Sequence, residues 1–435
     1  MQSIWNNDVT RHSFESLKGD ITTDVLIIGG GMCGILCAYM LKRAGVDYVL
    51  VEADRICSGV TNNTTAKITF QHGLVYHKLI DKYGLEYAKK YYHSQRDAFN
   101  LLIELASEID DDFETCNNYV YSKNDRSVIE REILALNKIG CNAVFTTETE
   151  LPFEVSGAVK INNQAKFNPL KFALELSENL NIYEDTKVIE LAPNVAITNN
   201  GKIKAGKIIV ATHFPIINKH GGYFLKLFQH RSYVLALKNA SQLKDMYVDE
   251  DKAGLSMRSY NDMLLLGGGS HRTGGKGGNW AELEKFSEKY YPKAEKVAKW
   301  ATQDCMSLDN VPYIGVYSKT TPDLYVATGF NKWGMTSSMV SAMLLSDLIC
   351  GKRNDCTDIY SPQRSVFHPQ LAVNVFESAK GLFKLTKPRC PHMGCALNYN
   401  KAEHTWDCPC HGSRFEINEK LINNPATDDM KNNNF

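Results

Sequence analysis

Residues 24–34 read DVLIIGGGMCG, and this stretch decides the fold of the first part of the chain. Its apolar run DVLII has the length and continuity of a strand that is buried on both faces. Three glycines follow, and an apolar helical stretch starts at Met32. A second apolar run, residues 48–51, ends in Glu52. The order of strand, glycine turn, helix and strand predicts a β-α-β unit.

The three glycines of the motif Gly29-x-Gly31-x-x-Gly34 have distinct physical tasks. One makes a tight turn, one lets the backbone approach a pyrophosphate, and one lets the helix pack on the strand. The pyrophosphate is expected beside Met32, because free N–H groups and the helix dipole favour anions there. Glu52 is placed to accept hydrogen bonds from ribose hydroxyls. The motif predicts a dinucleotide site, but by itself it does not distinguish FAD from NAD.

The composition is that of an ordinary globular protein. Of the 435 residues, 43% are hydrophobic and 23% are charged, and 49 basic residues balance 49 acidic ones. This hydrophobicity excludes a largely disordered chain, and zero net charge gives no global attraction to nucleic acid or to an anionic membrane. Neither residues 1–20 nor the apolar stretch 339–350 has the pattern of a signal peptide or a membrane span. We therefore expect a cytoplasmic protein with no nucleic-acid partner and no membrane span.

Four stretches of the chain resemble the D-amino-acid-oxidase-like FAD-dependent oxidoreductases, a family that includes glycine and sarcosine oxidases. They are the N-terminal motif, RICSGVTNNTTAK at 55–67, KIIVATH at 207–213 and LYVATGFNKWGMTSSMVSAMLLSDLI at 324–349. The resemblance implies FAD as cofactor and an α/β fold, in which a Rossmann-like FAD-binding domain is interleaved with a β-rich substrate domain. One departure is the turn after the second strand, where the family has small residues and this chain has the longer, polar VTNNTTAK.

The same resemblance assigns residues outside the glycine motif to the flavin. The loop at 58–66 matches a segment that passes the pyrophosphate and the flavin, and the late glycine-rich segment matches one that lies against the isoalloxazine ring. The residues expected to contact FAD in addition to the motif are Ser58, Thr64, Thr65, Ala66, Val188, Gly329, Gly334, Met335 and Thr336. Val188 is included because it matches the position whose backbone meets the adenine.

Four of the twelve cysteines crowd into residues 390–410. Two pairs of potential metal ligands occur there, Cys390-x-His392 and Cys408-x-x-His411. Two thiolates and two imidazoles suit either zinc or a Rieske 2Fe–2S centre. Two further cysteines stand at equivalent places in the two loops, and a plain zinc site would not need them.

The runs CPHMGC at 390–395 and CPCHGS at 408–413 closely resemble the Rieske proteins. In that family two cysteines hold one iron and two histidines hold the other. The resemblance assigns these roles to four ligands, Cys390, His392, Cys408 and His411. It further implies a disulfide between Cys395 and Cys410, and a hydrogen bond from Ser413 to a cluster sulfur.

These motifs divide the chain into three parts. Residues 1–352 are expected to form the flavoprotein, with FAD-binding parts at roughly 20–75, 155–225 and 305–352 and a substrate domain at roughly 76–154 and 226–304. The polar, proline-containing stretch 353–372 is expected to be a linker. Residues 373–435 would then be a small Rieske module that leans on the flavoprotein, because so short a unit needs a metal or a partner surface for stability.

Several cationic and aromatic residues are candidates for the substrate site. Lys67, His271 and Lys332 are the expected catalytic residues, because a cation near the flavin stabilises its reduced, anionic ring. Further candidates are His72, His230, Arg231, Arg272 and Trp333. The glycine-rich stretch 267–278 is expected to be either a mobile flap over the flavin or a flexible surface loop.

The combined motifs predict a flavin-dependent oxidoreductase that acts on a small amine or an amino-acid-like substrate. Electrons would pass from FAD to the 2Fe–2S cluster and then to a one-electron carrier protein or acceptor. An appended one-electron centre favours a dehydrogenase over an oxidase. Two alternatives remain open at this point. The first is an electron-transfer or redox-sensing protein without catalysis, in which Cys395 and Cys410 form a switchable dithiol. The second is a flavin oxidase with a structural zinc.

Overall fold

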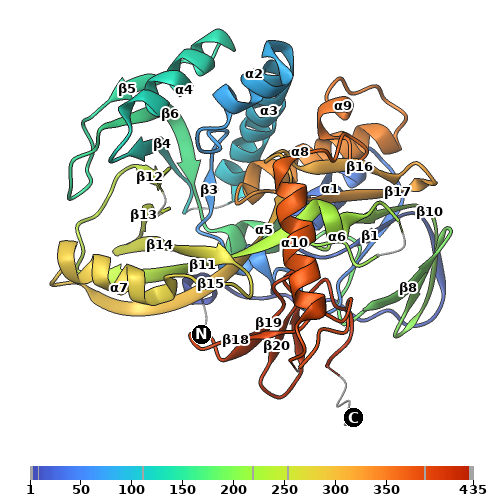
Figure 1. Cartoon of the computed structure of the whole chain (residues 1–435). Coiled ribbons are helices and arrows are strands. Elements are labelled where there is room, and N and C mark those ends of the chain that lie inside the picture. The colour runs from blue at the N-terminus through green and yellow to red at the C-terminus, as the bar shows by residue number, and fades with distance from the viewer. Residues whose placement is uncertain are drawn as a thin grey trace.

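Two large sheets and a small C-terminal sheet form the framework of the molecule (Figure 1). The structure is a computed structural model that describes residues 3–7, 9–109, 112–217, 220–251, 254–386 and 388–430. In this described part of the chain, no helix combines the length and the apolar character that crossing a lipid bilayer requires.

The first sheet is built around the glycine motif. Its strand order is β16-β17-β10-β1-β2-β7, and the hairpin of β8 and β9 joins it at β10. The strands are β1 (Ile21–Ile28), β2 (Tyr48–Val51), β7 (Ile182–Tyr183), β8 (Val188–Ala192), β9 (Val195–Thr198), β10 (Gly201–Val210), β16 (Tyr313–Ser318) and β17 (Thr321–Thr328). β1 lies between β10 and β2 and is parallel to both, and the apolar side chains of residues 25–28 are buried. The expected β-α-β unit is confirmed.

Two helices pack together against this sheet, α1 (Met32–Arg43) and α8 (Gly334–Ile349). The short helices η1 (Ile4–Asn6), η2 (Val60–Asn63) and α5 (Pro169–Ser177) lie close by. A Cβ on Gly34 would lie 1.9 Å from the carbonyl oxygen of Gly29, so only glycine lets α1 approach β1 this closely. Gly29 has φ +110°, a conformation that residues with a side chain rarely adopt.

The second sheet has the strand order β15-β11-β14-β13-β12-β4-β6-β3, with β5 beside β6. Its strands are β3 (Lys67–Ile68), β4 (Glu114–Ser122), β5 (Val144–Thr146), β6 (Gly157–Lys166), β11 (Leu227–Lys238), β12 (Met246–Asp249), β13 (Ser256–Tyr260), β14 (Met263–Arg272) and β15 (Glu295–Ser307). Its helices are α2 (Tyr76–Tyr83), α3 (Leu85–Ile109), α4 (Arg126–Lys138) and α7 (Asn279–Tyr290). β3 and β6 thus belong to this sheet, although the sequence analysis placed their residues in the FAD-binding parts.

The first half of the glycine-rich stretch 267–278 forms part of a strand, so it is neither a flap nor a loop. Residues 267–272 continue β14, which is paired with β11 on one side and with β13 on the other. Gly267 pairs with Val234 of β11 and with Ser256 of β13, so the ladder hydrogen bonds hold this part in place. Periodicity could not reveal the strand, because glycines give no alternation of apolar and polar side chains.

The C-terminal part consists of one helix and a small antiparallel sheet with the order β18-β19-β20-β21 (Figure 1). The elements are α10 (Pro369–Phe383), β18 (Asn398–Asn400), β19 (Thr405–Asp407), β20 (Arg414–Glu416) and β21 (Leu421–Asn423). α10 contacts the short helix α6 (Tyr223–Lys226) of the larger part.

The stretch 353–372 differs from the expected polar linker. It contains α9 (Thr357–Tyr360) and the start of α10, and Tyr360 is fully buried. Arg364 forms a buried ion pair with Asp309, with 2.7 Å between Nη2 and Oδ1. The polar residues that suggested an exposed linker therefore fasten this segment to the flavoprotein, and a distant carboxylate such as Asp309 cannot be recognised as a partner from sequence.

Candidate functional site

A cavity of about 710 Å³ opens at the carboxyl ends of β1 and β2, where the glycine motif turns into α1. Ligands of parallel α/β sheets bind at this edge. Of the residues expected to contact FAD, those that line it are Gly29, Gly31, Met32, Glu52, Ser58, Val188, Gly334 and Met335. Thr64 and Thr65 line a second cavity instead, while Gly34, Ala66, Gly329 and Thr336 are in the lining of neither.

The polar groups at the motif are held by short hydrogen bonds. The Glu52 carboxylate accepts the N–H of Gly30 at 2.6 Å, and burial raises the pKa of Glu52. The N–H of Met32, at the start of α1, donates to Oγ1 of Thr61 at 2.9 Å. Thr61 belongs to the polar turn that departs from the family pattern, and the sequence analysis missed it.

The chemistry of this cavity fits a dinucleotide. A Cβ added to Gly31 would meet no atom closer than Thr61 Oγ1, at 3.5 Å, so the backbone faces open space at the point where a pyrophosphate is expected. His213 lines the cavity, and its Nε2 is buried without a hydrogen-bond partner among the described residues. A buried polar atom of this kind is normally satisfied, so a bound group with a polar atom would complete the site.

Residues of the C-terminal part also line this cavity, which the sequence did not indicate. The segment 420–429 follows β20 and closes one side of the cavity, near Val188. Lys187 donates to the carbonyl oxygen of Thr427, which fixes this closure. The dinucleotide cavity is therefore shared between the flavoprotein and the C-terminal module.

A second cavity, of about 320 Å³, adjoins the first at Gly334 and Met335. Four of the residue candidates line it, and they are Lys67, His72, Lys332 and Trp333. On one wall Lys332 donates to Oγ of Ser270 at 2.9 Å, and Asp304 interacts electrostatically with the lysine. Burial lowers the pKa of Lys332 and raises that of Asp304.

Lys67, where β3 begins, also lines this cavity. Its ammonium donates to Oγ of Ser256. Burial, reinforced by the nearby Arg258 guanidinium, lowers the pKa of Lys67 to about 7. Arg258 is itself buried and donates to the carbonyl oxygens of Thr65 and Ala66, so it fixes the loop that precedes Lys67. A neutral amine at Lys67 can accept a proton near neutral pH.

His72 is held rigidly in the lining of the second cavity. Its ring stacks on Trp333, with the ring centroids 5.0 Å apart. Its nitrogens bond the Tyr91 hydroxyl at 2.8 Å and Oγ1 of Thr336 at 3.0 Å. Burial lowers the pKa of His72 to about 3, so the ring is neutral at physiological pH.

The structure does not support the expected catalytic role of His271. Its side chain lies outside the lining of both cavities and bonds the hydroxyl of Tyr233 at 3.1 Å and Oδ1 of Asn279 at 3.2 Å. Successive side chains of a strand point to opposite faces. Because β14 continues through the glycines, Ser270 lines the cavity and His271 points away.

His230, Arg231 and Arg272 are also absent from the lining of the two cavities. Arg231 pairs with Glu403 of the C-terminal module. Arg272 donates to the carbonyl oxygens of Pro409 and Cys410, between two of the expected metal ligands. These two arginines therefore join the two parts of the chain.

The four expected ligands come together in the loops before β18 and β20. Cys390, Cys408 and His411 are buried, and the rings of His392 and His411 lie 4.9 Å apart. A shared hydrogen bond between the two thiols lowers the pKa of Cys390 to about 7 and raises that of Cys408. Burial keeps both imidazoles neutral, with pKa values lowered to about 4 for His392 and about 3 for His411. Neutral imidazoles and thiolates are the forms that bind metal.

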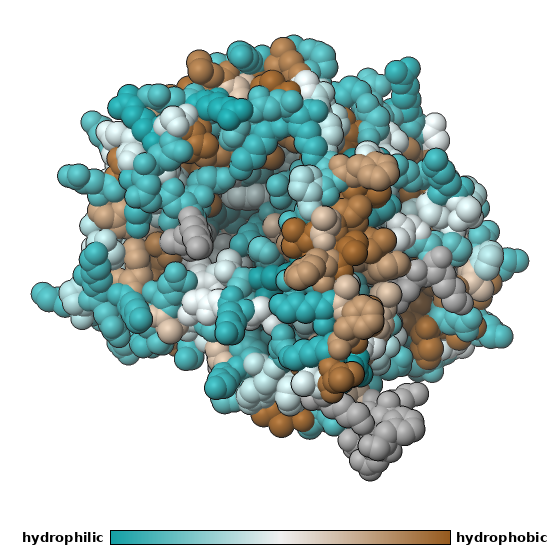
Figure 2. Space-filling view, in the orientation of Figure 1, coloured by the Kyte–Doolittle hydropathy of each residue, from teal (hydrophilic) through white to brown (hydrophobic). Residues whose placement is uncertain are grey.

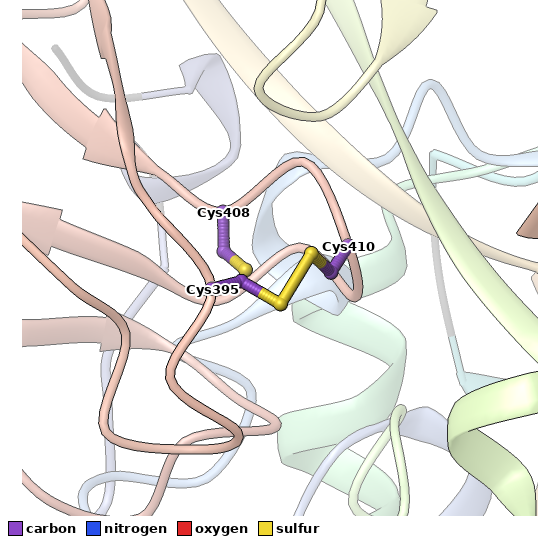
Figure 3. Close-up of side chains that lie close together, drawn as sticks. All are labelled: Cys395, Cys408 and Cys410. Atoms are coloured by element: carbon purple, nitrogen blue, oxygen red, sulfur yellow. A yellow bond between two sulfur atoms is a disulfide. The ribbon is translucent and has the colours of Figure 1, made fainter. Parts of the chain in front are cut away.

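The chemistry of this donor set fits a 2Fe–2S centre. Both ring nitrogens of His411 are buried without a hydrogen-bond partner in the described part of the chain. Cys395 and Cys410 form a disulfide, with their Cα atoms 6.7 Å apart, and Cys408 lies beside it (Figure 3). The sulfur atoms of these three cysteines lie within 4.8 Å of one another, but the two in the disulfide are not available as metal ligands.

Ser413 bonds the sulfur of Cys390, and its Oγ also accepts the N–H of Ala426 at 3.0 Å. Hydrogen bonds to cluster sulfurs raise the reduction potential, because they stabilise the added electron. Ser413→Ala is therefore expected to lower the potential of the cluster in a redox titration followed by EPR. The matched control is Ser378→Ala, since the Ser378 hydroxyl is buried nearby without a hydrogen-bond partner in the described residues. An unchanged or higher potential for Ser413→Ala would contradict the expectation.

A buried ion network fastens the C-terminal sheet to β11. Glu403 pairs with Arg231 and with Arg414, and Arg414 pairs in turn with Asp407. Burial alone would raise the pKa of Glu403, but the two arginines hold it below its ordinary value.

Glu403→Gln is expected to lower the unfolding free energy of the C-terminal module by about 3 kcal/mol, because it leaves Arg231 buried without a carboxylate. The measurement is the denaturant midpoint at which the visible absorbance of the cluster is lost. Glu416→Gln is the control, since Glu416 is exposed on β20. Equal midpoints for the two variants would show that the network does not hold the module.

Residues 212–214 lie between the dinucleotide cavity and the metal site. Thr212 and His213 line the cavity, and the ring of Phe214 lies 6.4 Å from the rings of both His392 and His411. Asn424 donates to the carbonyl oxygens of Thr212 and Phe214.

A pair of glutamines on the second sheet supports the same junction. Gln229 donates to the carbonyl oxygen of His411 at 2.9 Å, and Gln303 donates to that of Gly412 at 2.9 Å. Gln303 also donates to Gln229 at 2.6 Å. The loop that carries His411 is thereby fixed against β11 and β15.

Two family models match this chain. The FAD dependent oxidoreductase (DAO) model matches residues 24–348, and the Rieske [2Fe-2S] domain model matches residues 356–433. The Rieske 2Fe-2S iron-sulfur protein YhfW of Bacillus subtilis (strain 168) is 32% identical, over 99% of this chain and 97% of that protein. Gamma-glutamylputrescine oxidoreductase of Escherichia coli (strain K12) is 22% identical, over 78% of this chain and 86% of its own.

Among solved structures, glycine oxidase from Geobacillus kaustophilus superposes with a TM-score of 0.67. The superposition covers 79% of this chain and 99% of the oxidase, at 19% sequence identity. This likeness supports the fold that the family models indicate.

Proposed function

Because the chain belongs to the FAD dependent oxidoreductase family and carries a Rieske 2Fe–2S domain, we propose that it oxidises a small amine or amino acid and sends the electrons from FAD to the cluster. When bound, FAD supplies a hydride acceptor, and the cluster supplies a carrier of single electrons. Each substrate would lose two electrons, so two single transfers to an external one-electron acceptor complete a turnover.

The contact between residues 212–214 and the cluster histidines carries this proposal. Phe214 touches the edge of the site where His392 and His411 stand, and His213 lines the cavity proposed for FAD. One short segment of backbone therefore reaches from the proposed FAD cavity to the cluster histidines. The segment 420–429, which closes the FAD cavity, supports the same coupling from the other side.

The second cavity is proposed as the substrate site. It adjoins the dinucleotide cavity at Gly334 and Met335, which the proposal assigns to the flavin end of FAD. Lys332 is suited to bind a substrate carboxylate, and Asp304 is suited to bind an ammonium group beside it. A lysine beside an aspartate in this lining favours a zwitterionic amino acid or an amine that carries an acidic group.

Lys67 is proposed to accept the proton of the substrate ammonium. An amine must lose this proton before its C–H bond can give up a hydride, because the free nitrogen lone pair stabilises the developing cation. The lowered pKa of Lys67, about 7, makes its neutral form available for this task. His72 and Trp333, stacked on each other, would shape the cavity between Lys67 and the flavin.

Similar proteins support this substrate class. Gamma-glutamylputrescine oxidoreductase and glycine oxidase are both named for substrates that contain a C–N bond to be oxidised. The appended cluster favours a dehydrogenase, because it offers the electrons a route other than oxygen.

The test is an anaerobic screen of amines and amino acids. The readout is the bleaching of the flavin absorbance. We expect at least one zwitterionic or acidic amine to bleach the flavin of the native protein. The Lys332→Met variant should bind the same compound more weakly while its flavin spectrum is retained. If no amine bleaches the flavin and another substrate class does, the proposed substrate is wrong.

A further inference from the structure

Helix α10 presents an apolar face to solvent (Figure 2). Phe376 and Phe383 of this helix are 65% and 82% exposed, and Phe367 and Leu385, just beyond its ends, are 88% and 95% exposed. The other exposed apolar residues of the helix are Val373, Val375 and Leu382. We call this set of seven residues the α10 face.

The helix is packed with its polar side inward. Asn374 is buried, donates to the carbonyl oxygen of Leu225 and accepts a hydrogen bond from Arg272. Gly381 is also buried, and a Cβ there would lie 2.5 Å from the sulfur of Cys410. The usual arrangement of a surface helix is the reverse, with the apolar stripe on the core. A contiguous exposed apolar surface of this kind marks an interaction site.

The charges around the α10 face are basic. The described lysines and arginines of residues 365–400 are Lys380, Lys384 and Arg389, and the one acidic residue of this stretch, Glu377, lies 3.9 Å from the Lys380 ammonium. Lys380 is exposed on the helix, three residues before Phe383. Helices that lie in the interface of an anionic membrane combine phenylalanine and leucine with lysine and arginine in this way.

A second copy of the chain fits this surface less well. In a two-fold interface the same patch meets itself, so Lys380 and Lys384 would be brought close to their own equivalents. The net charge of the whole chain is zero, so this basic surface is a local feature that an anionic lipid surface would complement.

We propose that the α10 face docks this protein on an anionic membrane, with the phenylalanines in the headgroup region and the lysines on the lipid phosphates. The docked surface lies over the cluster loops, because Gly381 packs on the disulfide sulfur of Cys410. The disulfide loop of the cluster module would then lie beneath the docked helix, whatever the substrate of the flavoprotein is.

The test is flotation of the full-length, cofactor-loaded protein with lipid vesicles at low and high salt. The protein should float with vesicles of phosphatidylglycerol and phosphatidylcholine, and less with phosphatidylcholine alone or at high salt, because salt screens the basic residues. Phe376→Ser with Phe383→Ser should weaken binding at least about tenfold, since two apolar anchors are lost. Lys380→Gln with Lys384→Gln should weaken binding only to the anionic vesicles.

Leu134→Ser with Ile189→Ser is the matched control, because each of these side chains is 62% exposed and lies elsewhere on the surface. It should leave binding unchanged. Failure of the native protein to float with anionic vesicles would overturn the proposal. So would self-association in sedimentation velocity that the two phenylalanine substitutions abolish, since the face would then join two copies.

Discussion

Replacing Cys408 by serine is expected to abolish the cluster and to leave the flavin chemistry intact. Cys408 is a buried sulfur beside the disulfide and one of the four ligands assigned to the metal site (Figure 3). Its loss removes a thiolate that a 2Fe–2S centre requires. The Cys408→Ser protein should show no EPR signal of a reduced Rieske centre after dithionite.

The same variant distinguishes catalysis at the flavin from electron transfer to an external acceptor. Substrate should still bleach the flavin, while substrate-dependent reduction of cytochrome c falls by more than about 100-fold, because metal sites respond at least this strongly to ligand loss. Cys350→Ser, at the half-buried end of α8, is the control and should behave like the native protein. Unchanged reduction of cytochrome c by Cys408→Ser would mean that electrons leave the flavin by another route.

Replacing Lys67 by methionine is expected to lower kcat/KM for the substrate by about 10²–10⁴-fold, the range that a general base contributes. Methionine fills the space of the lysine stem but cannot accept a proton. The flavin spectrum and the cluster signal of Lys67→Met should be retained, because Lys67 lines the second cavity and neither the dinucleotide cavity nor the cluster loops. Lys78→Met, at an exposed lysine on the rim of the same cavity, is the control.

The activity that depends on Lys67 should change with pH in a specific way. The pKa of Lys67 is lowered to about 7, so the neutral, proton-accepting form predominates above that pH and the charged form predominates below it. In the native protein kcat/KM should therefore rise with pH through about 7 and then level off. In Lys67→Met this rise should be absent. A native profile without an inflection near this pH would show that Lys67 is not the proton acceptor.

The glycine motif and the cluster motif could be interpreted from sequence because local physics determines each of them. A strand, a glycine turn and a helix form a local unit that positions a dinucleotide, and the structure contains that β-α-β unit. The Cys-x-His and Cys-x-x-His spacings bring four donors together within two short loops.

The candidate substrate residues were harder to assign, because their roles depend on strand direction and on distant partners. His271 lies outside the lining of both cavities, because β14 continues through its glycines and strand alternation puts Ser270 toward the cavity instead. Arg231 and Arg272 bond Glu403 and the loop at 409–410, and the sequence could not indicate these partners because they lie more than 130 positions further along the chain. Nothing in the sequence indicated Asp304, because it lies near Lys332 only in the folded chain, where β15 carries it.

The most direct measurement of the proposed electron route is rapid-freeze EPR after anaerobic mixing with a substrate that bleaches the flavin. We predict that the signal of the reduced cluster appears as the flavin passes on its electrons, with a first-order rate that does not change when the protein is diluted. This behaviour would follow from transfer within one chain, across residues 212–214 between the FAD cavity and the cluster histidines. A cluster that stays oxidised while the flavin is reduced, or a rate that falls in proportion to protein concentration, would contradict the proposed route.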